Sequence, residues 1–129
     1  MASAVFTAYQ QRNIVLRDMG FDSYAEYQRS KLWKGIRERQ LMKQPWCTGC
    51  GSKAWQVHHL RYDKPTMLGR CSGSLVSVCG QCHFSCEFDA LGSKLSIEEV
   101  NKRLLSLLRS SPAAAYKNAR TAKVIKRGR

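Results

Sequence analysis

The sequence has no long apolar run and few acidic residues, and each scarcity excludes a class of protein. Its longest apolar run near the start, Ile14-Val15-Leu16, is too short for the hydrophobic region of a secretory signal or for a membrane span. We therefore expect a cytoplasmic protein without a membrane partner. In that reducing compartment its six cysteines would stay free thiols rather than form a disulfide framework.

Acidic residues are missing altogether beyond Glu99. All nine Asp and Glu lie at or before that position, whereas nine of the 22 Lys and Arg follow it. So steep a gradient favours a polyanionic partner, with DNA as the leading candidate and RNA as the other nucleic acid that these charges would bind. The alternative is a solvated tail that only aids solubility. The tail residues expected to contact nucleic acid are Lys117, Arg120, Lys123, Lys126, Arg127 and Arg129.

Four of the cysteines form two Cys-x2-Cys pairs, Cys47 with Cys50 and Cys79 with Cys82. This is the spacing of zinc knuckles, and four thiolates close a tetrahedral site with no open position, so we predict a structural zinc. A chain of 129 residues builds one domain with a modest core, which such a metal would stabilise. Cys86 is expected to be a small buried hydrophobe, although its direction on a helix would also suit zinc, and Cys71 to take no part.

A histidine pair and a His-x3-Glu pair remain beside the cysteines. His83 and Glu87 would lie one turn apart on a helix, on a stripe next to that of the zinc cysteines, so one helix could serve two metals. Nitrogen and oxygen ligands suit a second, catalytic metal. His58 and His59 would point to opposite faces of a strand, and a lone strand histidine is more often structural than a ligand. Both would serve one reaction only if the metal lies on one side and the substrate reaches the other, or if the strand bends.

Pattern and capping signals give the expected order of elements. Ser23-Tyr24-Ala25-Glu26 and Ser96-Ile97-Glu98-Glu99 both have the form of a capping box, and each precedes apolar residues at helical spacing. The helix that begins near Cys79 is expected to end before Gly92. The expected elements are a weakly amphipathic helix before Gly20, a helix over about 24–43, strands over 55–60 and 75–78, a loop over 63–74, a helix from near 79 to about 91, and a last helix after Ser96.

Four runs of the sequence carry one combined pattern. They are Trp33-x3-Arg37-x3-Leu41, Cys47-x2-Cys50-Gly51, Val57-His58-His59-Leu60-x-Tyr62 and Leu75-Val76-Ser77-Val78-Cys79-x2-Cys82-His83. Over about residues 23–88 the chain resembles HNH endonucleases that carry a four-cysteine zinc. The resemblance implies a small α+β protein with a ββα-metal, treble-clef-like core. The chain would then comprise an N-terminal extension (1–22), the nuclease core with its zinc knuckles (23–92), a C-terminal helix (93–111) and a basic, flexible tail (112–129).

The resemblance also implies roles for the histidines. His58 and His83 would bind the catalytic metal, Glu87 takes the place where the family often has its last histidine, and His59 would be the general base. A carboxylate ligand shifts the preference toward Mg²⁺ or Mn²⁺, while Zn²⁺ and Ni²⁺ are ions that histidines also accept. The family's middle asparagine is Ser74 here, which keeps a hydroxyl to steady the histidine-bearing loop but lacks the two-sided reach of an amide.

The implied function is hydrolysis of phosphodiester bonds in DNA by a monomer or weak dimer that nicks one strand. Neutral His59 would take a proton from water, and the metal would act as a Lewis acid on the phosphate. Arg61 would either contact a phosphate oxygen or be solvated. Compact HNH proteins of this kind resemble those of phages and mobile elements, so we expect a bacterial host or a phage-infected cell. The alternative is a catalytically inactive, zinc-stabilised nucleic-acid-binding module, which the Ser74 and Glu87 departures support.

Overall fold

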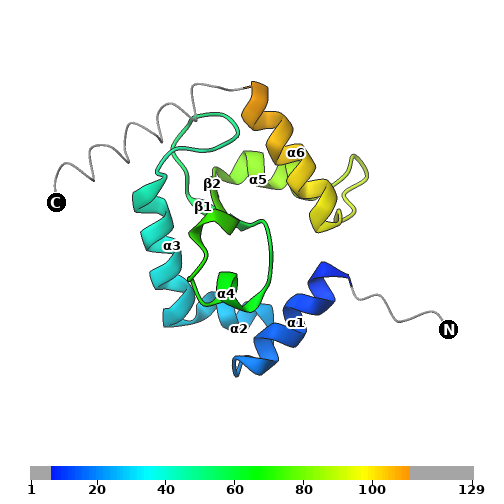
Figure 1. Ribbon diagram of the computed structural model, residues 1–129. Coiled ribbons are helices and arrows are strands. Elements are labelled where there is room, and N and C mark those ends of the chain that lie inside the picture. The colour runs from blue at the N-terminus through cyan, green and yellow to red at the C-terminus, as the bar shows by residue number, and fades with distance from the viewer. Residues whose placement is uncertain (1–6, 111–129) are drawn as a thin grey trace.

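A computed structural model describes residues 7–110 of the 129-residue chain (Figure 1). This part contains six α-helices and one two-stranded sheet, which confirms the small α+β class. The predicted basic tail lies outside the described residues. In chain order the elements are α1 (Ala8–Asp18), α2 (Tyr24–Arg29), α3 (Lys31–Lys43), β1 (Gln56–His59), α4 (Lys64–Met67), the 3-10 turn η1 (Ser72–Ser74), β2 (Leu75–Val78), α5 (Gly80–Glu87) and α6 (Ile97–Ser110).

The antiparallel β1–β2 sheet lies between two groups of helices and separates two hydrophobic cores (Figure 1). Its register sets His58 opposite Val76 and His59 opposite Leu75. Because side chains alternate across a strand, one face of the sheet turns to α2 and α3 and the other to α5 and α6. The first core gathers Leu16, Tyr27, Trp33, Ile36, Val57, Met67 and Leu75. The second gathers Cys47, Val78, Cys86, Val100 and Leu104.

The single helix expected over about 24–43 is wrong, because Ser30 breaks it into α2 and α3. Ser30 has extended backbone angles (φ −75°, ψ 156°), and its hydroxyl accepts from the Trp33 amide at 3.2 Å, so it caps the new helix. At the start of α2, Ser23 accepts from the Glu26 amide as predicted, but the Glu26 carboxylate accepts from Asp22 rather than from Ser23. The break lets α2 and α3 each present an aromatic side chain to the same core.

Three further expectations need correction. The connection over 63–74 is not all loop, since Asp63 caps the short helix α4, whose Met67 is fully buried and accepts a hydrogen bond from the Tyr27 hydroxyl at 2.8 Å. The helix expected to reach about residue 91 ends at Glu87, because Phe88 is extended and forms a bridge with Lys94. The first strand is also shorter than 55–60 and covers Gln56–His59.

The last helix follows its predicted signal. Ser96 accepts from the Glu99 amide at 3.3 Å, and the buried residues Ile97, Val100 and Leu104 form its core-facing stripe. In Figure 1 this helix passes close to α5, the helix that begins at the second cysteine pair. None of the helices in this part of the chain is long and apolar enough to cross a membrane.

Candidate metal centres

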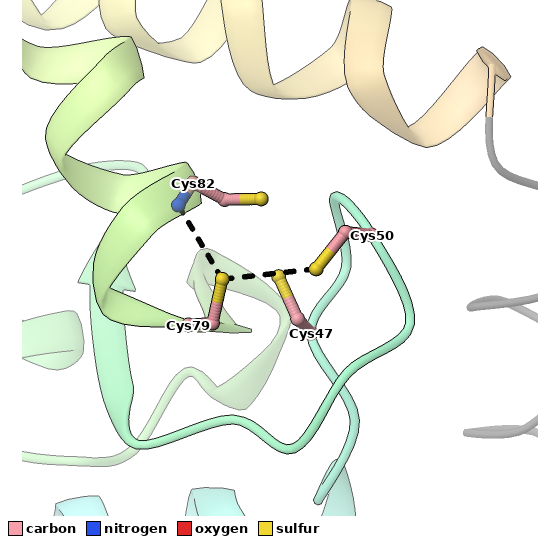
Figure 2. A group of neighbouring side chains, drawn as sticks. All are labelled: Cys47, Cys50, Cys79 and Cys82. Carbon is pink, nitrogen blue, oxygen red and sulfur yellow. Dashed lines mark hydrogen bonds between the residues drawn. The ribbon is translucent and has the colours of Figure 1, made fainter.

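The four cysteines predicted to bind zinc converge on one point (Figure 2). Cys47 and Cys50 come from the turn between α3 and β1, and Cys79 and Cys82 from the start of α5. All four sulfur atoms lie within 4.8 Å of one another, and those of Cys50 and Cys79 are 3.7 Å apart. Zn–S bonds of about 2.3 Å in a tetrahedron place sulfur atoms about 3.8 Å apart, so the cluster has the dimensions of a zinc site.

Backbone amides and a hydroxyl prepare these sulfurs to be thiolates. The Gly49 amide donates to the sulfur of Cys47 at 3.3 Å, and the Cys82 amide donates to that of Cys79 at 3.4 Å. The hydrogen bond from Ser52 lowers the pKa of Cys50 to about 6. Burial raises the pKa of Cys47 and Cys82, a cost that a bound cation offsets because it binds the deprotonated form. The donor set therefore fits a structural zinc.

The remaining cysteines lie outside this cluster. Cys86 is 2% exposed and belongs to the second hydrophobic core, as expected of a small buried hydrophobe. The sulfur of Cys71 lies 3.3 Å from the hydroxyl of Ser74. Gly49 approaches the zinc cysteines so closely that a Cβ there would lie 3.1 Å from the sulfur of Cys82, closer than an ordinary van der Waals contact.

A second group of candidate ligands joins β1 to α5. His58, His83 and Glu87 offer one atom each within 4.8 Å of one another. Burial acts to raise the pKa of Glu87, but the close polar contacts and charges of His83 and Lys94 outweigh it and lower the pKa to about 2. Burial lowers the pKa of His58 to about 4. At neutral pH the site therefore holds an ionised carboxylate and a neutral His58, the forms that bind a metal ion.

The two histidines of this group each have one ring nitrogen against an amide oxygen. Nε2 of His58 is 2.9 Å from Oδ1 of Asn101, and Nδ1 of His83 is 2.7 Å from Oε1 of Gln56. Nε2 of His83 is 2.9 Å from Oε1 of Glu87, yet this contact is not a well-directed hydrogen bond, and among the described residues the buried nitrogen has none. A cation shared by these groups would satisfy that nitrogen, so the residues present fit a metal.

His59 lies on the opposite face of β1, among aromatic rings. It is 1% exposed, its ring centroid lies 4.7 Å from that of Trp33, and the Tyr24 hydroxyl is 3.5 Å from its Nδ1. Burial lowers its pKa to about 3, so the imidazole is neutral at pH 7. Its Nε2 is buried without a hydrogen-bond partner in the described part of the chain.

One cleft nevertheless reaches both faces. A cavity of about 520 Å³ is lined by His58, His59, His83 and Glu87 together. Both histidines of the pair therefore reach one space, as a single reaction would require. Most of the other side chains of its wall are cationic or aromatic, namely Arg12, Arg37, Lys94, Tyr9, Tyr24, Tyr62, Trp33 and Trp55. Such a wall suits a phosphate-bearing ligand.

Sequence reasoning missed Arg12, which belongs to the N-terminal extension. Its guanidinium carbon lies 4.1 Å from the ring centroid of Tyr24, 5.2 Å from that of Tyr9 and 5.4 Å from that of Tyr62. These aromatic rings hold the cation in place without neutralising its charge. The extension is therefore part of the cleft. The only local signal was the spacing of Tyr9 and Arg12 on one helical face.

The supporting residues Ser74 and Arg61 contact each other. Ser74 is 1% exposed, its carbonyl accepts from the Leu60 amide at 2.8 Å, and its hydroxyl accepts from Nε of Arg61 at 3.2 Å. Ser74 thus holds the segment that follows His59. Arg61 is not among the residues that line the cleft. The six tail residues predicted to bind nucleic acid lie outside the described residues.

Comparisons of the chain with protein-family models, curated proteins and solved structures found no match.

Proposed function

We propose that the chain is a metal-dependent endonuclease of the HNH kind, with a ββα-metal core, that hydrolyses phosphodiester bonds in DNA and nicks one strand at a time. The observation that carries this proposal is the joint lining of one cleft by the His58, His83 and Glu87 group and by His59. A closed zinc site has no use for a second set of nitrogen and oxygen ligands. The zinc cysteines would fix α5, and α5 presents His83 and Glu87.

His59 would act as the general base. Its neutral ring has Nδ1 next to the Tyr24 hydroxyl, which leaves the unpaired Nε2 to accept a proton from water. A pKa of about 3 makes a weak base, but an anionic phosphate bound in the cleft would stabilise the imidazolium and raise that pKa. Loss of such a base costs on the order of 10²- to 10⁴-fold in rate.

The metal would be held by His58, His83 and Glu87. When bound, a divalent ion supplies Lewis-acid activation of the phosphate and stabilises the departing oxygen. The ionised Glu87 favours Mg²⁺ or Mn²⁺, and the two imidazoles also suit Zn²⁺ or Ni²⁺. The second ring nitrogen of each histidine already contacts an amide oxygen, and this contact orients the ring so that its other nitrogen would face the metal.

Substrate binding would use the cationic wall of the cleft. Arg12 lies over three tyrosine rings, and Arg37 donates to the carbonyl of Trp55, so both cations are held in position. Lys94 lies 3.0 Å from Glu87, and its charge is partly neutralised there. Arg12 is therefore the leading candidate to bind the scissile phosphate. The tail residues would add affinity without base readout.

Nicking of supercoiled plasmid tests the proposal. Wild-type protein, His59→Ala and the matched control Gln81→Ala, an exposed position on α5, are compared with Mg²⁺, with Mn²⁺ and without added metal. We expect metal-dependent nicking by the wild type and the control, and a rate lower by at least about a hundredfold for His59→Ala. Equal rates for His59→Ala and wild type would remove His59 as the base.

A catalytically inactive, zinc-stabilised nucleic-acid-binding module is the second candidate. The observation that favours it is the burial of His59, which is 1% exposed and packs on Trp33 as a structural histidine would. This candidate predicts tight binding of DNA with no cleavage in any metal. The plasmid assay, read beside a binding titration of the same protein, separates the two functions.

A further inference from the structure

Asn101 of α6 bridges the end of β1 with its side-chain amide. Nδ2 donates to the carbonyl oxygen of Leu60 at 2.9 Å, and Oδ1 lies 2.9 Å from Nε2 of His58. The buried residues Val100 and Leu104 fix the rotation of α6 around this position. A helix outside the nuclease-like stretch is thereby joined to a candidate metal ligand 43 residues away in sequence.

The bridge settles which nitrogen of His58 carries a proton. A peptide carbonyl only accepts hydrogen bonds, so Nδ2 of Asn101 must face Leu60 and Oδ1 must face His58. Oδ1 has no hydrogen to give, so Nε2 of His58 must be the donor. The lone pair of the neutral ring is then at Nδ1, and Nδ1 is the nitrogen able to bind a cation.

In His83 the roles of the two ring nitrogens are the reverse of those in His58: Nδ1 contacts an amide oxygen and Nε2 is the nitrogen available to a cation. Its Nδ1 is 2.7 Å from Oε1 of Gln56, and its Nε2 faces the Glu87 carboxylate. Metal-binding histidines commonly donate their other N–H to an oxygen, which fixes the tautomer and raises the basicity of the ligand nitrogen. Asn101 and Gln56 occupy those outer positions for His58 and His83.

Asn101 also completes the hold on the residue after His59. The Leu60 amide donates to the Ser74 carbonyl at 2.8 Å, while the Leu60 carbonyl accepts from Asn101. Both backbone groups of Leu60 are therefore used. The amide of Asn101 reaches in two directions at once, which the hydroxyl of Ser74 cannot do.

We propose that Asn101 is a positioning residue that holds His58 in the Nε2–H tautomer and so makes Nδ1 available to the second metal. This inference rests on the metal site of the proposed function but not on cleavage of DNA. It assigns the C-terminal helix a part in that site.

Two substitutions separate this role from simple packing. Asn101→Leu removes both hydrogen bonds, whereas Asn101→Asp keeps an oxygen for His58 and loses the donor to Leu60. Ser106→Ala, at an exposed position on the same helix, is the matched control. Nitrogen-15 NMR of the His58 imidazole reports the tautomer in protein that keeps one zinc but has no second metal. Titration with Mn²⁺ then gives the affinity of the second site.

We expect the Nε2–H tautomer in the wild type, in Ser106→Ala and in Asn101→Asp, and a mixture of tautomers in Asn101→Leu. Manganese affinity should fall about 10- to 100-fold in Asn101→Leu and stay within about threefold of wild type in Asn101→Asp. Equal losses in both variants would show that only the Leu60 contact matters and would overturn the proposal. So would an unchanged tautomer in Asn101→Leu, or a wild type that binds no second metal. If metal binding and the tautomer are as expected but the plasmid is not cleaved, the proposed nuclease function would be rejected and the proposed role of Asn101 would be supported.

Discussion

His58 and His59 are consecutive in β1, yet their side chains lie on opposite faces of the sheet and line the same cleft. His58 faces Asn101 and His83, with its ring centroid 5.4 Å from that of His83, whereas His59 packs on Trp33. Alternation along the strand thus separates a candidate metal ligand from a candidate base without removing either from the cavity.

Zinc should be lost when one cysteine of the cluster is changed. Cys79→Ser removes a thiolate from a closed four-sulfur site, and because such sites contribute directly to folding, we expect loss of bound zinc and of the cooperative thermal transition. Elemental analysis and circular dichroism measure both. Cys71→Ser is the control and should keep one zinc per chain. Full zinc in Cys79→Ser would contradict the assignment of the cluster.

Binding of the second metal should depend on His83 of α5, the helix that also carries the second pair of zinc cysteines. His83→Ala removes a ligand whose buried Nε2 has no hydrogen bond, so we expect affinity for Mn²⁺ to fall by about a hundredfold or more while the zinc content is unchanged. Isothermal titration of the zinc-loaded protein measures it. Gln81→Ala should bind as the wild type does. An unaltered affinity in His83→Ala would place the second metal elsewhere.

Arg12 should contribute one phosphate contact. Its guanidinium lies in the cleft over the Tyr24 ring, so Arg12→Gln should weaken binding to DNA of any sequence and reduce the slope of log affinity against log salt by about 1. Fluorescence anisotropy at several salt concentrations gives the slope. The control Arg17→Gln changes an exposed residue of the same helix outside the cleft. Identical slopes for both variants would remove Arg12 from the binding surface.

Acid should destabilise the protein partly through His59. The pKa of this histidine is about 6.5 unfolded and about 3 folded, so between those values the unfolded chain binds more protons and stability falls as the pH falls. From about pH 7 to about pH 5, wild type should lose on the order of 2 kcal/mol more than His59→Gln. Chemical denaturation across that range tests this. Parallel profiles would mean that His59 is not buried in solution.

Local patterns predicted the parts of the site that are close in sequence. The Cys-x2-Cys pairs and the capping signal at Ser96 each act within one turn, so spacing alone identified the sulfur cluster and the start of α6. The break at Ser30 was not predicted, because the local sequence around a serine does not show whether it caps a new helix or lies inside a longer one. Its cause is the packing of α2 and α3 against one core.

Contacts between distant segments could not be predicted in this way. Arg12 meets Tyr62 in the cleft, and Asn101 meets His58, only because the chain fold brings α1 and α6 to β1 and to the segment that follows it. No local pattern marks Asn101, and the helical spacing of Tyr9 and Arg12 is a weak signal for Arg12. Both lie outside residues 23–88, the stretch that carries the nuclease-like pattern. The nuclease-like stretch over 23–88 therefore receives contacts at its candidate site from α1 and α6, the helices that flank it in sequence.

The proposed nuclease requires two metals at two separate sites of one chain. X-ray diffraction from crystals grown with Mn²⁺, recorded at the zinc and manganese absorption edges, tests it most directly. We predict a zinc peak among Cys47, Cys50, Cys79 and Cys82 and a separate manganese peak among His58, His83 and Glu87. A zinc peak at the cysteines with no metal among the histidines and Glu87 would contradict the catalytic site and favour the binding module.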